Sequence, residues 1–560
     1  MKFSEMPYQR IDFDKVKVKF EEIKKSFVNA KSGEEQFEIH KQYYDLINEI
    51  ETMMTIAQIR HDIDTKDEFY DKEQAYYDEI SPLIHNMQVS YVKQLYESSY
   101  KEYLEEKIGK VAFKNIEISL KAFDEKIIQL MQEENTLTTA YDKLIASAAI
   151  DWEGETLNLS LLRKYLTSKD RLIRKKAYDK YCDFFESNAK ELDDIYDKLV
   201  QNRTKQAREL GYDNYLQLGY YRMNRNCYDK EMVENFRNQI KEYFVPFVQR
   251  LHERRRERLG LDKLSYIDEA VFFLNGNPEP VGTPDEIMQN GQTMYRELSA
   301  ETKEFFDFMT ENQLFDVLGR KTKKAGGYMT YLPLYKAPFI FANFNGTSGD
   351  IDVITHECGH AFQGYLSGKD PIKEHADITM ETAEIHSMSM EFFTEPWMEK
   401  FFGERTNDYL SMHLEEAAAF IPYGCMVDEF QHIVYENPEM TCAKRHQVWI
   451  DLEKIYRPHI DYTGSPYFEK GGFWQKQLHI YDYPLYYIDY CIAQTCAFQY
   501  KVWMDENFEE AWSSYLKLCK LSASDFFTNM IKEVGLKSPF EDGGVEDIVT
   551  KLSTKLFKEN

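Results

Sequence analysis

The sequence of 560 residues has little glycine and proline and no long apolar run. Its 25 glycines and 16 prolines make up about 7% of the chain, against roughly 12% in an average protein. No stretch of 18 apolar residues occurs, and residues 1–10 (MKFSEMPYQR) lack the apolar segment of a signal peptide. These absences exclude the disordered, collagen-like and membrane-spanning classes. They favour a mostly helical globular protein that stays in the cytoplasm.

Cysteine and positive charge are also scarce. The eight cysteines are irregularly placed and none are spaced as CxxC, so a disulfide framework is not expected and reduced thiols are. Lys and Arg number 69 against 96 Asp and Glu, which gives a net charge of −27. Such a chain repels nucleic-acid phosphates and anionic lipid, so we expect neither nucleic acid nor a membrane as partner. The Arg-rich stretch at 252–260 is interpreted as a solvated face or as cations at a helix end.

Long amphipathic helices are predicted for the first part of the chain. Residues 13–135 show a helical alternation of charged and apolar side chains with almost no Gly or Pro, and Pro82 is placed to begin a new helix. The pattern changes at 148–160 (AAIDWEGETLNLS), where Ser160 is a candidate cap for the next helix. We therefore divide the chain into an N-terminal helical region, 1–155, and a second region, 156–560.

A short segment of the second region is the least helical part of the protein. Residues 276–284 (GNPEPVGTP) are typical of a linker, and a helix is expected from Pro284 to about Leu318, with Gly319 as its stop. The following segment, 323–350, combines glycines, prolines and aromatic residues that favour strands. It predicts a small hairpin or sheet, after which the chain is helical again.

Directly after this segment stands the motif THECGHA, residues 355–361. On a helix, His356 and His360 lie one turn apart on one face, so both imidazoles can reach one cation at the zinc–nitrogen distance of about 2.0 to 2.1 Å. Glu357 lies beside that face and can hold a water on the metal without being a ligand. Ser348 or Asp350 is expected to cap this helix.

A catalytic zinc needs a third protein ligand. The helix predicted at 378–393 offers three glutamates, and spacing alone does not choose among them: Glu381, Glu384 and Glu391. His386 is a competing candidate, although it points roughly 200° away from Glu384 by helix geometry. Cys358 points off the face of the two histidines, and a packing role is expected for it.

These residues resemble the zinc oligopeptidases that include thimet oligopeptidase and oligoendopeptidase F. Besides HECGHAF, the stretch AEIHSMSME is similar to the family's second motif, a glutamate followed seven residues later by another. The resemblance makes Glu384 a metal ligand and Glu391 an outer partner. The Ile-His-Ser within this motif, together with residues 168–181 and 535–549, is nearer to the oligoendopeptidase F branch. The family resemblance implies a mostly α, multi-helix zincin-type metallopeptidase with a deep central channel, one Zn²⁺ per chain and short peptides as substrates.

The resemblance also assigns the segment HIYDYPLYYIDY, residues 479–490. In this family a histidine and two tyrosines bind the substrate and its tetrahedral intermediate, which implies catalytic roles for His479, Tyr483 and Tyr490. Because the histidine is one residue closer to the first tyrosine than in thimet oligopeptidase, Tyr486 and Tyr487 are alternatives that bind substrate. Aromatic packing in a helical core is the other interpretation of this cluster.

The β segment has a possible role in binding an extended peptide. An exposed strand edge such as 338–343 could pair with a peptide through main-chain hydrogen bonds. On this hypothesis we assign substrate binding to residues of the segment: Gly326, Gly327, Phe341 and Asn343. The alternative is a hairpin that only packs under the helix of the HExxH motif.

Together these features predict a cytoplasmic zinc endopeptidase that hydrolyses internal bonds of short peptides, with Glu357 as general base. One alternative is a zinc exopeptidase of the carboxypeptidase or dipeptidyl carboxypeptidase type, and another is a non-catalytic helical protein that binds peptides. The oligomeric state is left open by the sequence. The net charge of −27 further predicts a preference for cationic or neutral peptides.

Overall fold

The computed structural model describes residues 1–320, 322–324 and 326–557, without the side chains of Asp78 and Pro82. Residue 325 of the predicted β segment and residues 558–560 of the second predicted region therefore lie outside the description. The chain forms two compact units, each built from three separate stretches of sequence. The first contains 1–120, 279–404 and 503–536, and the second contains 121–278, 405–502 and 537–560. The predicted division at residue 155 stays a prediction, and the compact units divide the chain differently.

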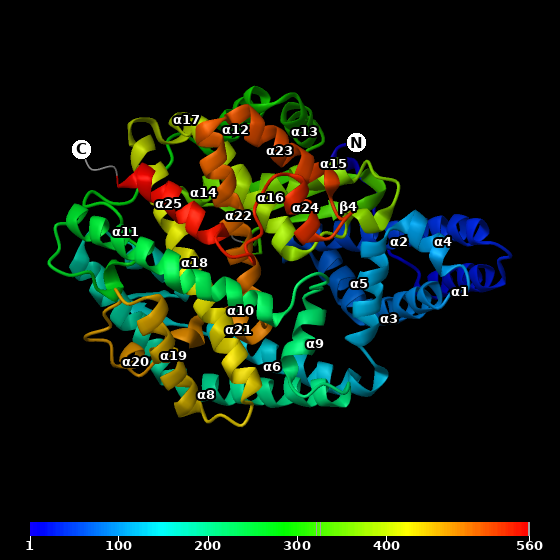
Figure 1. The fold of residues 1–560 in the computed structure, drawn as a ribbon, viewed down its shortest axis with the longest axis horizontal. Helices are drawn as coiled ribbons and strands as arrows, with labels where there is room; N and C mark the ends of the chain where they lie inside the picture. Colours follow the sequence, from blue (N-terminus) through cyan, green and yellow to red (C-terminus); the bar gives the residue numbers. More distant parts are fainter. Residues whose placement is uncertain (321, 325, 558–560) are drawn as a thin grey trace. The chain divides into compact units, whose positions relative to one another are not determined.

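The first unit is mostly helical, and Figure 1 follows its segments by colour. Its helices are α1 (Phe13–Asn29), α2 (Gly33–Ile63), α3 (Glu68–Tyr96), α4 (Lys101–Ile108), α5 (Lys110–Lys121), α12 (Pro284–Leu298), α13 (Ala300–Glu311), α14 (Gly349–Asp352), α15 (Cys358–Ser367), α16 (Met380–Phe393), α17 (Glu399–Phe402), α23 (Phe508–Leu521) and α24 (Phe527–Glu533). Helix α23 comes from the third stretch of sequence and packs against α15 and α16 from the second. The helix α15, which carries the second half of the HExxH motif, therefore packs against segments that are far from it in sequence.

The N-terminal helices form where the amphipathic pattern predicts them. The carboxylate of Asp12 accepts the backbone N–H of Lys15 at the start of α1, and α1 buries an apolar stripe against α2. The prediction that Pro82 begins a helix is wrong, because α3 runs through it from Glu68 to Tyr96. The start of α3 is capped instead by Asp67, whose side chain accepts the N–H groups of Phe69 and Tyr70.

The prediction of a single helix from Pro284 to Leu318 is also wrong. It is divided into α12 and α13 at Ser299, whose hydroxyl accepts the Thr302 N–H at 3.1 Å in a capping box. A strand, β3 (Phe315–Leu318), then takes the place of the expected last helical turns. The capping box at Ser299 therefore begins a new helix within the predicted one, and no helix reaches Gly319.

The β segment is a three-stranded mixed sheet with the order β3–β5–β4. Strand β5 (Ala337–Phe344) is parallel to β3 and antiparallel to β4 (Tyr328–Leu332). The expectation of a small β segment before the HExxH motif is confirmed, but the expectation that 338–343 is an exposed edge is wrong. Strand β5 is paired on both sides, and its residues from Ala337 to Ala342 are buried. The two edges of the sheet are β3 and β4.

The second unit is mostly helical too. Its helices are α6 (Ile128–Ala146), α7 (Leu159–Leu166), α8 (Arg171–Glu209), α9 (Tyr215–Arg222), α10 (Lys230–Gln239), α11 (Val245–Arg258), α18 (Thr406–Glu436), α19 (Cys442–Tyr456), α20 (Pro466–Glu469), α21 (Leu478–Asp482), α22 (Tyr487–Glu506) and α25 (Gly544–Leu556). Helix α22 continues for its last four residues into the first unit. With both units helical, the predicted mostly α fold is confirmed.

The change of pattern at 148–160 is a β-hairpin. Strands β1 (Ile150–Trp152) and β2 (Glu155–Leu157) pair antiparallel. The following helix, α7, is capped by Asn158, whose side-chain oxygen accepts the Leu161 N–H at 2.8 Å, and not by the expected Ser160.

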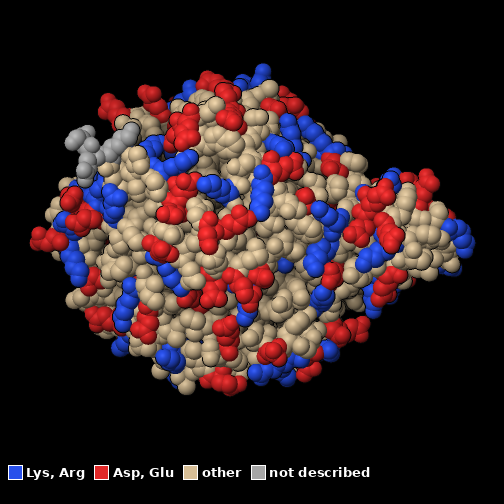
Figure 2. Space-filling model, in the orientation of Figure 1, with Lys and Arg blue, Asp and Glu red and all other residues tan. Residues whose placement is uncertain are grey.

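The Arg-rich stretch ends α11, as one of its two interpretations predicts. Both terminal amino groups of Arg258 contact the carboxylate of Glu415 at 2.8 Å, and Arg255 contacts Glu269. These cations are used inside the second unit. On the face shown in Figure 2, acidic and basic side chains are interspersed and neither sign forms a continuous patch. Among the described residues, no helix is long and apolar enough to cross a membrane.

Candidate metal centre and active site

The HExxH motif lies on a helix whose winding changes within the motif. After α14, residues Val353–Glu357 form a π-helical turn, and α15 begins at Cys358. His356 thus belongs to the π turn and His360 to the α-helix. The predicted helix is present, but Ser348 makes no side-chain cap. Asp350 instead accepts the N–H groups of Asn345 and Gly346, both at 2.8 Å, and ties the helix start to the end of β5.

Three side chains converge as a donor set for one cation. Glu384 Oε2 lies 3.4 Å from His356 Nε2 and 3.6 Å from His360 Nε2. Ligand atoms at about 2.0 to 2.1 Å from a tetrahedral zinc are about 3.4 Å from one another. The spacing of His356, His360 and Glu384 therefore fits a zinc ion, and of the three glutamates left open by sequence spacing, Glu384 alone is in this set.

Glu391 contacts the other side of His356. Its Oε1 lies 2.6 Å from His356 Nδ1, so this nitrogen donates to the carboxylate, while Nε2 faces Glu384. Burial alone would lower the pKa of His356, but hydrogen bonds with Glu384 and Glu391 outweigh it and raise the pKa well above 6.5. Burial lowers the pKa of His360 to about 4. The carboxylates thus attract positive charge to the position that a metal ion would take.

Glu357 lies next to the donor set and to the edge of the sheet. Burial raises the pKa of its carboxyl group, and the backbone N–H of Met329 in β4 donates a hydrogen bond to it. The strand that reaches this glutamate is therefore the edge strand β4 and not the 338–343 segment that the sequence indicated.

The rival ligands are used elsewhere. Glu381 accepts a hydrogen bond from the Thr379 hydroxyl at 2.5 Å at the start of α16. His386 is fully buried near the Tyr515 ring, and burial lowers its pKa to about 3. Cys358 is also fully buried, and its thiol forms a hydrogen bond with the Tyr295 hydroxyl. Neither His386 nor Cys358 lies in the donor set.

Gly359 brings the two helices of the centre together. A Cβ at this position would lie 2.6 Å from the Ser387 Cα and 2.7 Å from the His386 carbonyl oxygen, both backbone atoms. Only glycine allows α15 to approach α16 this closely, and the approach places Glu384 beside the two histidines. Sequence reasoning missed this residue, although a glycine inside a helical pattern is a signal of close packing.

Replacing Gly359 with alanine should therefore lower the melting temperature and weaken zinc binding. Overpacking of this kind costs about 1 to 3 kcal/mol, and here the obstacle is backbone. Gly364→Ala is the matched control on the same helix, because its Cβ would meet only the Tyr331 ring at 3.6 Å. Thermal unfolding and metal analysis of both variants make the measurement, and equal values for the two would contradict this role of Gly359.

The residues assigned to peptide binding in the β segment divide into two groups. Phe341 is fully buried in the central strand and stacks on Tyr328 with ring centroids 4.9 Å apart, so its assignment to direct substrate contact is wrong. Asn343 donates from its amide to the carbonyl oxygens of Lys324 and Gly326 at 2.9 and 2.8 Å. It therefore holds the loop before β4, in which Gly326 has the positive φ of 95° and Gly327 lies close to the Phe341 carbonyl oxygen.

The tyrosine-rich segment is gathered around His479 within the second unit. His479 lies on α21, Tyr487 and Tyr490 lie on α22, and a break with Leu485 at a φ of 69° joins the two helices. The ring centroids of four tyrosines lie 4.8 to 6.1 Å from that of His479: Tyr483, Tyr486, Tyr487 and Tyr490. Tyr483 is 57% exposed, whereas the other three are partly buried. The five rings are thus one cluster.

Gln477 determines which nitrogen of His479 carries the proton. Its amide Nε2 donates to His479 Nδ1 at 3.0 Å, while its Oε1 accepts from the Tyr423 hydroxyl at 2.7 Å. Burial lowers the pKa of His479, which keeps the ring neutral. The proton is then on Nε2, so His479 presents an N–H donor. Sequence reasoning did not single out Gln477, whose only signal was its position two residues before His479.

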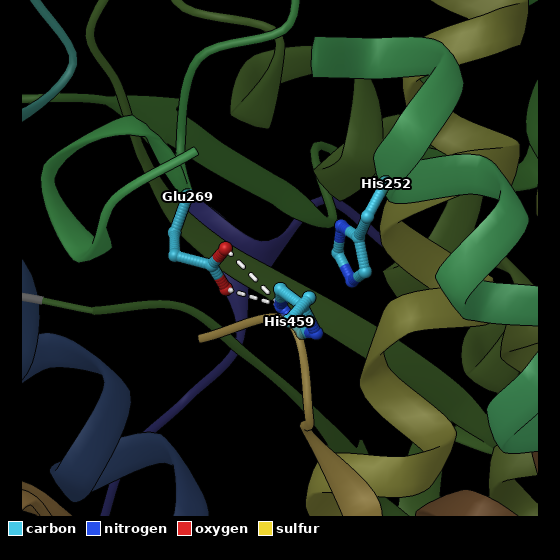
Figure 3. Close-up of side chains that lie close together, drawn as sticks. All are labelled: His252, Glu269 and His459. Atoms are coloured by element: carbon cyan, nitrogen blue, oxygen red, sulfur yellow. Dashed lines mark hydrogen bonds and ion pairs between the residues drawn. The ribbon is translucent and has the colours of Figure 1, made fainter. Parts of the chain in front are cut away.

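A second group of two histidines and a glutamate lies in the second unit (Figure 3). His252 and His459 stack with ring centroids 3.5 Å apart, and Glu269 pairs with His459. The Glu269 carboxylate already contacts Arg255 at 3.3 Å and Arg457 at 2.9 Å. Two guanidinium groups beside one carboxylate oppose a further cation. The group is therefore a hydrogen-bonded cluster that ties α11 to the loop after α19.

Comparisons with known proteins agree with this architecture. Residues 3–123 match the Peptidase M3 N-terminal domain, and residues 164–272 and 298–550 match Peptidase family M3. The solved structure of PZ peptidase A with an inhibitor is 48% identical, with a TM-score of 0.93 over 100% of both chains. Group B oligopeptidase PepB of Streptococcus agalactiae is 22% identical over 90% of this chain and 86% of its own. The oligoendopeptidase F homolog of Borreliella burgdorferi is 20% identical over 92% of this chain and 90% of its own.

The fold and the matching family together define a mostly α-helical peptidase. More narrowly, the chain belongs to peptidase family M3, on its oligoendopeptidase F branch. The family resemblance carried by HECGHAF and AEIHSMSME is thereby confirmed.

Proposed function

We propose that the protein is a zinc-dependent endopeptidase that hydrolyses internal bonds of short peptides. The observation that carries the proposal is the donor set of His356, His360 and Glu384, with mutual distances that fit one zinc ion per chain. Glu391 accepts a hydrogen bond from His356 Nδ1 and so provides the carboxylate partner that zinc-binding histidines usually have. The family's peptidase activity supports the choice of peptides as substrates.

Zinc, when bound, would supply a Lewis acid and an acidified water. Glu357 lies beside the donor set, and its raised pKa suits a group that takes a proton from the attacking water and gives it to the leaving amine. The Met329 N–H orients the Glu357 carboxylate. Gly326 and Gly327 are proposed to bind the peptide backbone, because glycine has no side chain to keep a second backbone away.

His479, Tyr483 and Tyr490 are proposed to contact the substrate, with Tyr486 and Tyr487 as further contacts. The resemblance of 479–490 to the family's segment supports these roles. The N–H that His479 presents is a donor suited to the oxyanion that develops on the attacked carbonyl. We further propose the cytoplasm as compartment, because the eight cysteines are free.

Metal analysis and product mapping test the proposal. Purified protein should contain about one zinc per chain and should cut a peptide that is blocked at both ends at internal bonds. A chelator should stop the cleavage and added zinc should restore it. Cuts that need an unblocked terminus would instead identify an exopeptidase, and metal-free protein that binds peptides without cleaving them would identify a binding protein.

Replacing Glu391 with glutamine should weaken zinc binding roughly 10- to 100-fold, because His356 loses a charged partner at Nδ1. A competition titration with a chromogenic chelator measures the affinity. Glu395→Gln, just after the end of α16, is the control and should bind zinc as the wild type does. Equal affinity in the wild type and Glu391→Gln would contradict the proposed role.

A further inference from the structure

Within the part of the chain that the structure describes, the ammonium group of Lys476 makes no ion pair. This lysine ends the short helix Gly472–Lys476 and is partly buried. Its Nζ lies 3.8 Å from the centroid of the Phe473 ring, and among the described residues Nζ has no hydrogen-bond or ion-pair partner. Burial and the neighbouring Arg457 lower the pKa of Lys476 to about 8, so the group is still mostly charged at neutral pH. In a chain with a net charge of −27, an unpaired and partly desolvated cation needs an explanation.

The two carboxylates whose charge acts on Lys476, Glu453 and Glu269, already pair with other groups. Glu453 contacts Arg457 at 3.3 Å and accepts the Tyr462 hydroxyl at 2.5 Å. Glu269, drawn in Figure 3 with His459, is shared between His459, Arg457 and Arg255. Arg457 therefore pairs with both Glu269 and Glu453, and neither carboxylate forms an ion pair with Lys476.

A row of aromatic rings connects Lys476 with His479. The ring of Tyr487 lies 4.8 Å from that of His479, Tyr423 lies 5.9 Å from Tyr487, and Phe473 lies 6.2 Å from Tyr423. All three rings are partly exposed. The Arg457 guanidinium lies over the rings of Tyr423 and Phe473, 5.4 and 5.1 Å from their centroids, so a second cation borders the row. The row thus has a histidine donor at one end and an ammonium group at the other.

We propose that Lys476 binds a carboxylate of the peptide substrate, while the peptide lies along the row of Tyr487, Tyr423 and Phe473. The inference rests on the proposed peptidase function and names a substrate class for it, peptides that carry a carboxylate. The carboxylate is either the free C-terminus or an acidic side chain. The cation supplies local recognition of an anion that the net charge of the chain would not predict.

A purely structural role for Lys476, packing against Phe473, is the competing explanation. It predicts that loss of the charge lowers stability and affects all peptides alike. Recognition of a carboxylate predicts that loss of the charge affects KM only for peptides that carry the carboxylate. The two are separated by comparing matched peptides and not by one activity value.

The experiment uses one neutral core sequence in four forms: with a free C-terminus, with a C-terminal amide, and as the amide with either Glu or Gln scanned through the sequence. KM and kcat are measured for the wild type, Lys476→Met, Lys476→Arg and Lys470→Met. Lys470 is a matched control between α20 and the short helix of Lys476, and its side chain is 72% exposed and paired with Glu186. Melting temperature and zinc content are recorded for every variant.

We expect Lys476→Met to raise KM roughly 10- to 100-fold for the peptide with the free C-terminus, with little change in kcat. For the amide peptide, KM should stay at the wild-type value. If the KM difference instead follows Glu against Gln, the carboxylate is an acidic side chain, which also supports the proposal. Lys476→Arg should restore most of the affinity, and Lys470→Met should match the wild type.

Equal KM values of the wild type for the acid and amide peptides and for the Glu and Gln peptides would overturn the proposal without any variant. An equal rise of KM for all four peptides in Lys476→Met would overturn it in favour of packing. These outcomes leave the peptidase function intact, because the peptides are still cleaved. A zinc-loaded wild type that cleaves none of them would overturn the proposed function and this inference together.

Discussion

Replacing Glu357 with glutamine should lower kcat/KM by roughly 10²- to 10⁴-fold while the zinc content stays at that of the wild type. Glutamine has nearly the same shape and can still accept the Met329 N–H, but it cannot take a proton from water. Because Glu357 is not in the donor set, the metal should remain. Cleavage of a quenched fluorescent peptide, together with metal analysis of the same sample, makes the measurement.

Glu304→Gln is the matched control for this variant. Glu304 lies on α13 in the same unit, its side chain is 62% exposed, and it pairs with Lys369 at 3.3 Å. The control should cleave at the wild-type rate. A Glu357→Gln variant that is equally fast would remove Glu357 as general base.

The pH dependence of the wild type provides a related result. The base must be ionised to accept a proton, and burial raises the pKa of Glu357 above the usual 4.5. The rate of the zinc-loaded enzyme should therefore fall on acidification when Glu357 takes up a proton, at a pH set by burial, which raises the pKa, and by the metal charge, which lowers it. This acidic limb should be absent from the residual activity of Glu357→Gln.

Replacing Glu384 with glutamine should remove most of the bound zinc and, with it, the activity. Its Oε2 is the one carboxylate oxygen in the donor set, 3.4 and 3.6 Å from the two histidine nitrogens. A neutral amide oxygen is a poorer zinc ligand than a carboxylate, so the affinity should fall by more than the roughly 10- to 100-fold expected for an outer partner. Zinc per chain after gel filtration and a chelator titration measure the loss.

The same substitution at the two other glutamates of α16 makes the assignment sharp. Glu391→Gln should lose an intermediate amount of zinc affinity, and Glu381→Gln should lose least, because the Glu381 side chain accepts a hydrogen bond from Thr379 at the helix start. This order follows from the distances and not from sequence spacing. A variant of Glu381 that loses more zinc than that of Glu384 would contradict the donor set.

The inference on Lys476 also bears on how endopeptidase and exopeptidase products would differ. A carboxylate anchor would bind the C-terminus of the peptide in either kind of enzyme. An exopeptidase then gives products of one or two residues, whereas an endopeptidase gives longer ones and still cuts amide peptides with a weaker KM. Product lengths from peptides of increasing size therefore decide between the two within the same experiment.

The sequence by itself determined the features that depend on local pattern. Helical periodicity and the scarcity of glycine and proline predicted a mostly α protein, and glycines with aromatic residues predicted the small sheet. The i, i+4 spacing of His356 and His360 predicted two donors on one face, because the helical repeat determines which side chains are neighbours. The motifs HECGHAF and AEIHSMSME were sufficient for the family.

The tertiary structure decided what depends on approach between distant segments. Three glutamates on one helix are equivalent in spacing, and Glu384 is selected because Gly359 lets α15 and α16 touch at backbone distance. Strand β5 was predicted as an edge, but pairing on both sides makes it central, since strand order is not encoded in the alternation of a single strand. Likewise, a lysine among many in an acidic chain became distinctive only when the fold placed Glu269 and Glu453 against Arg457 and, among the described residues, left Lys476 without an ion pair.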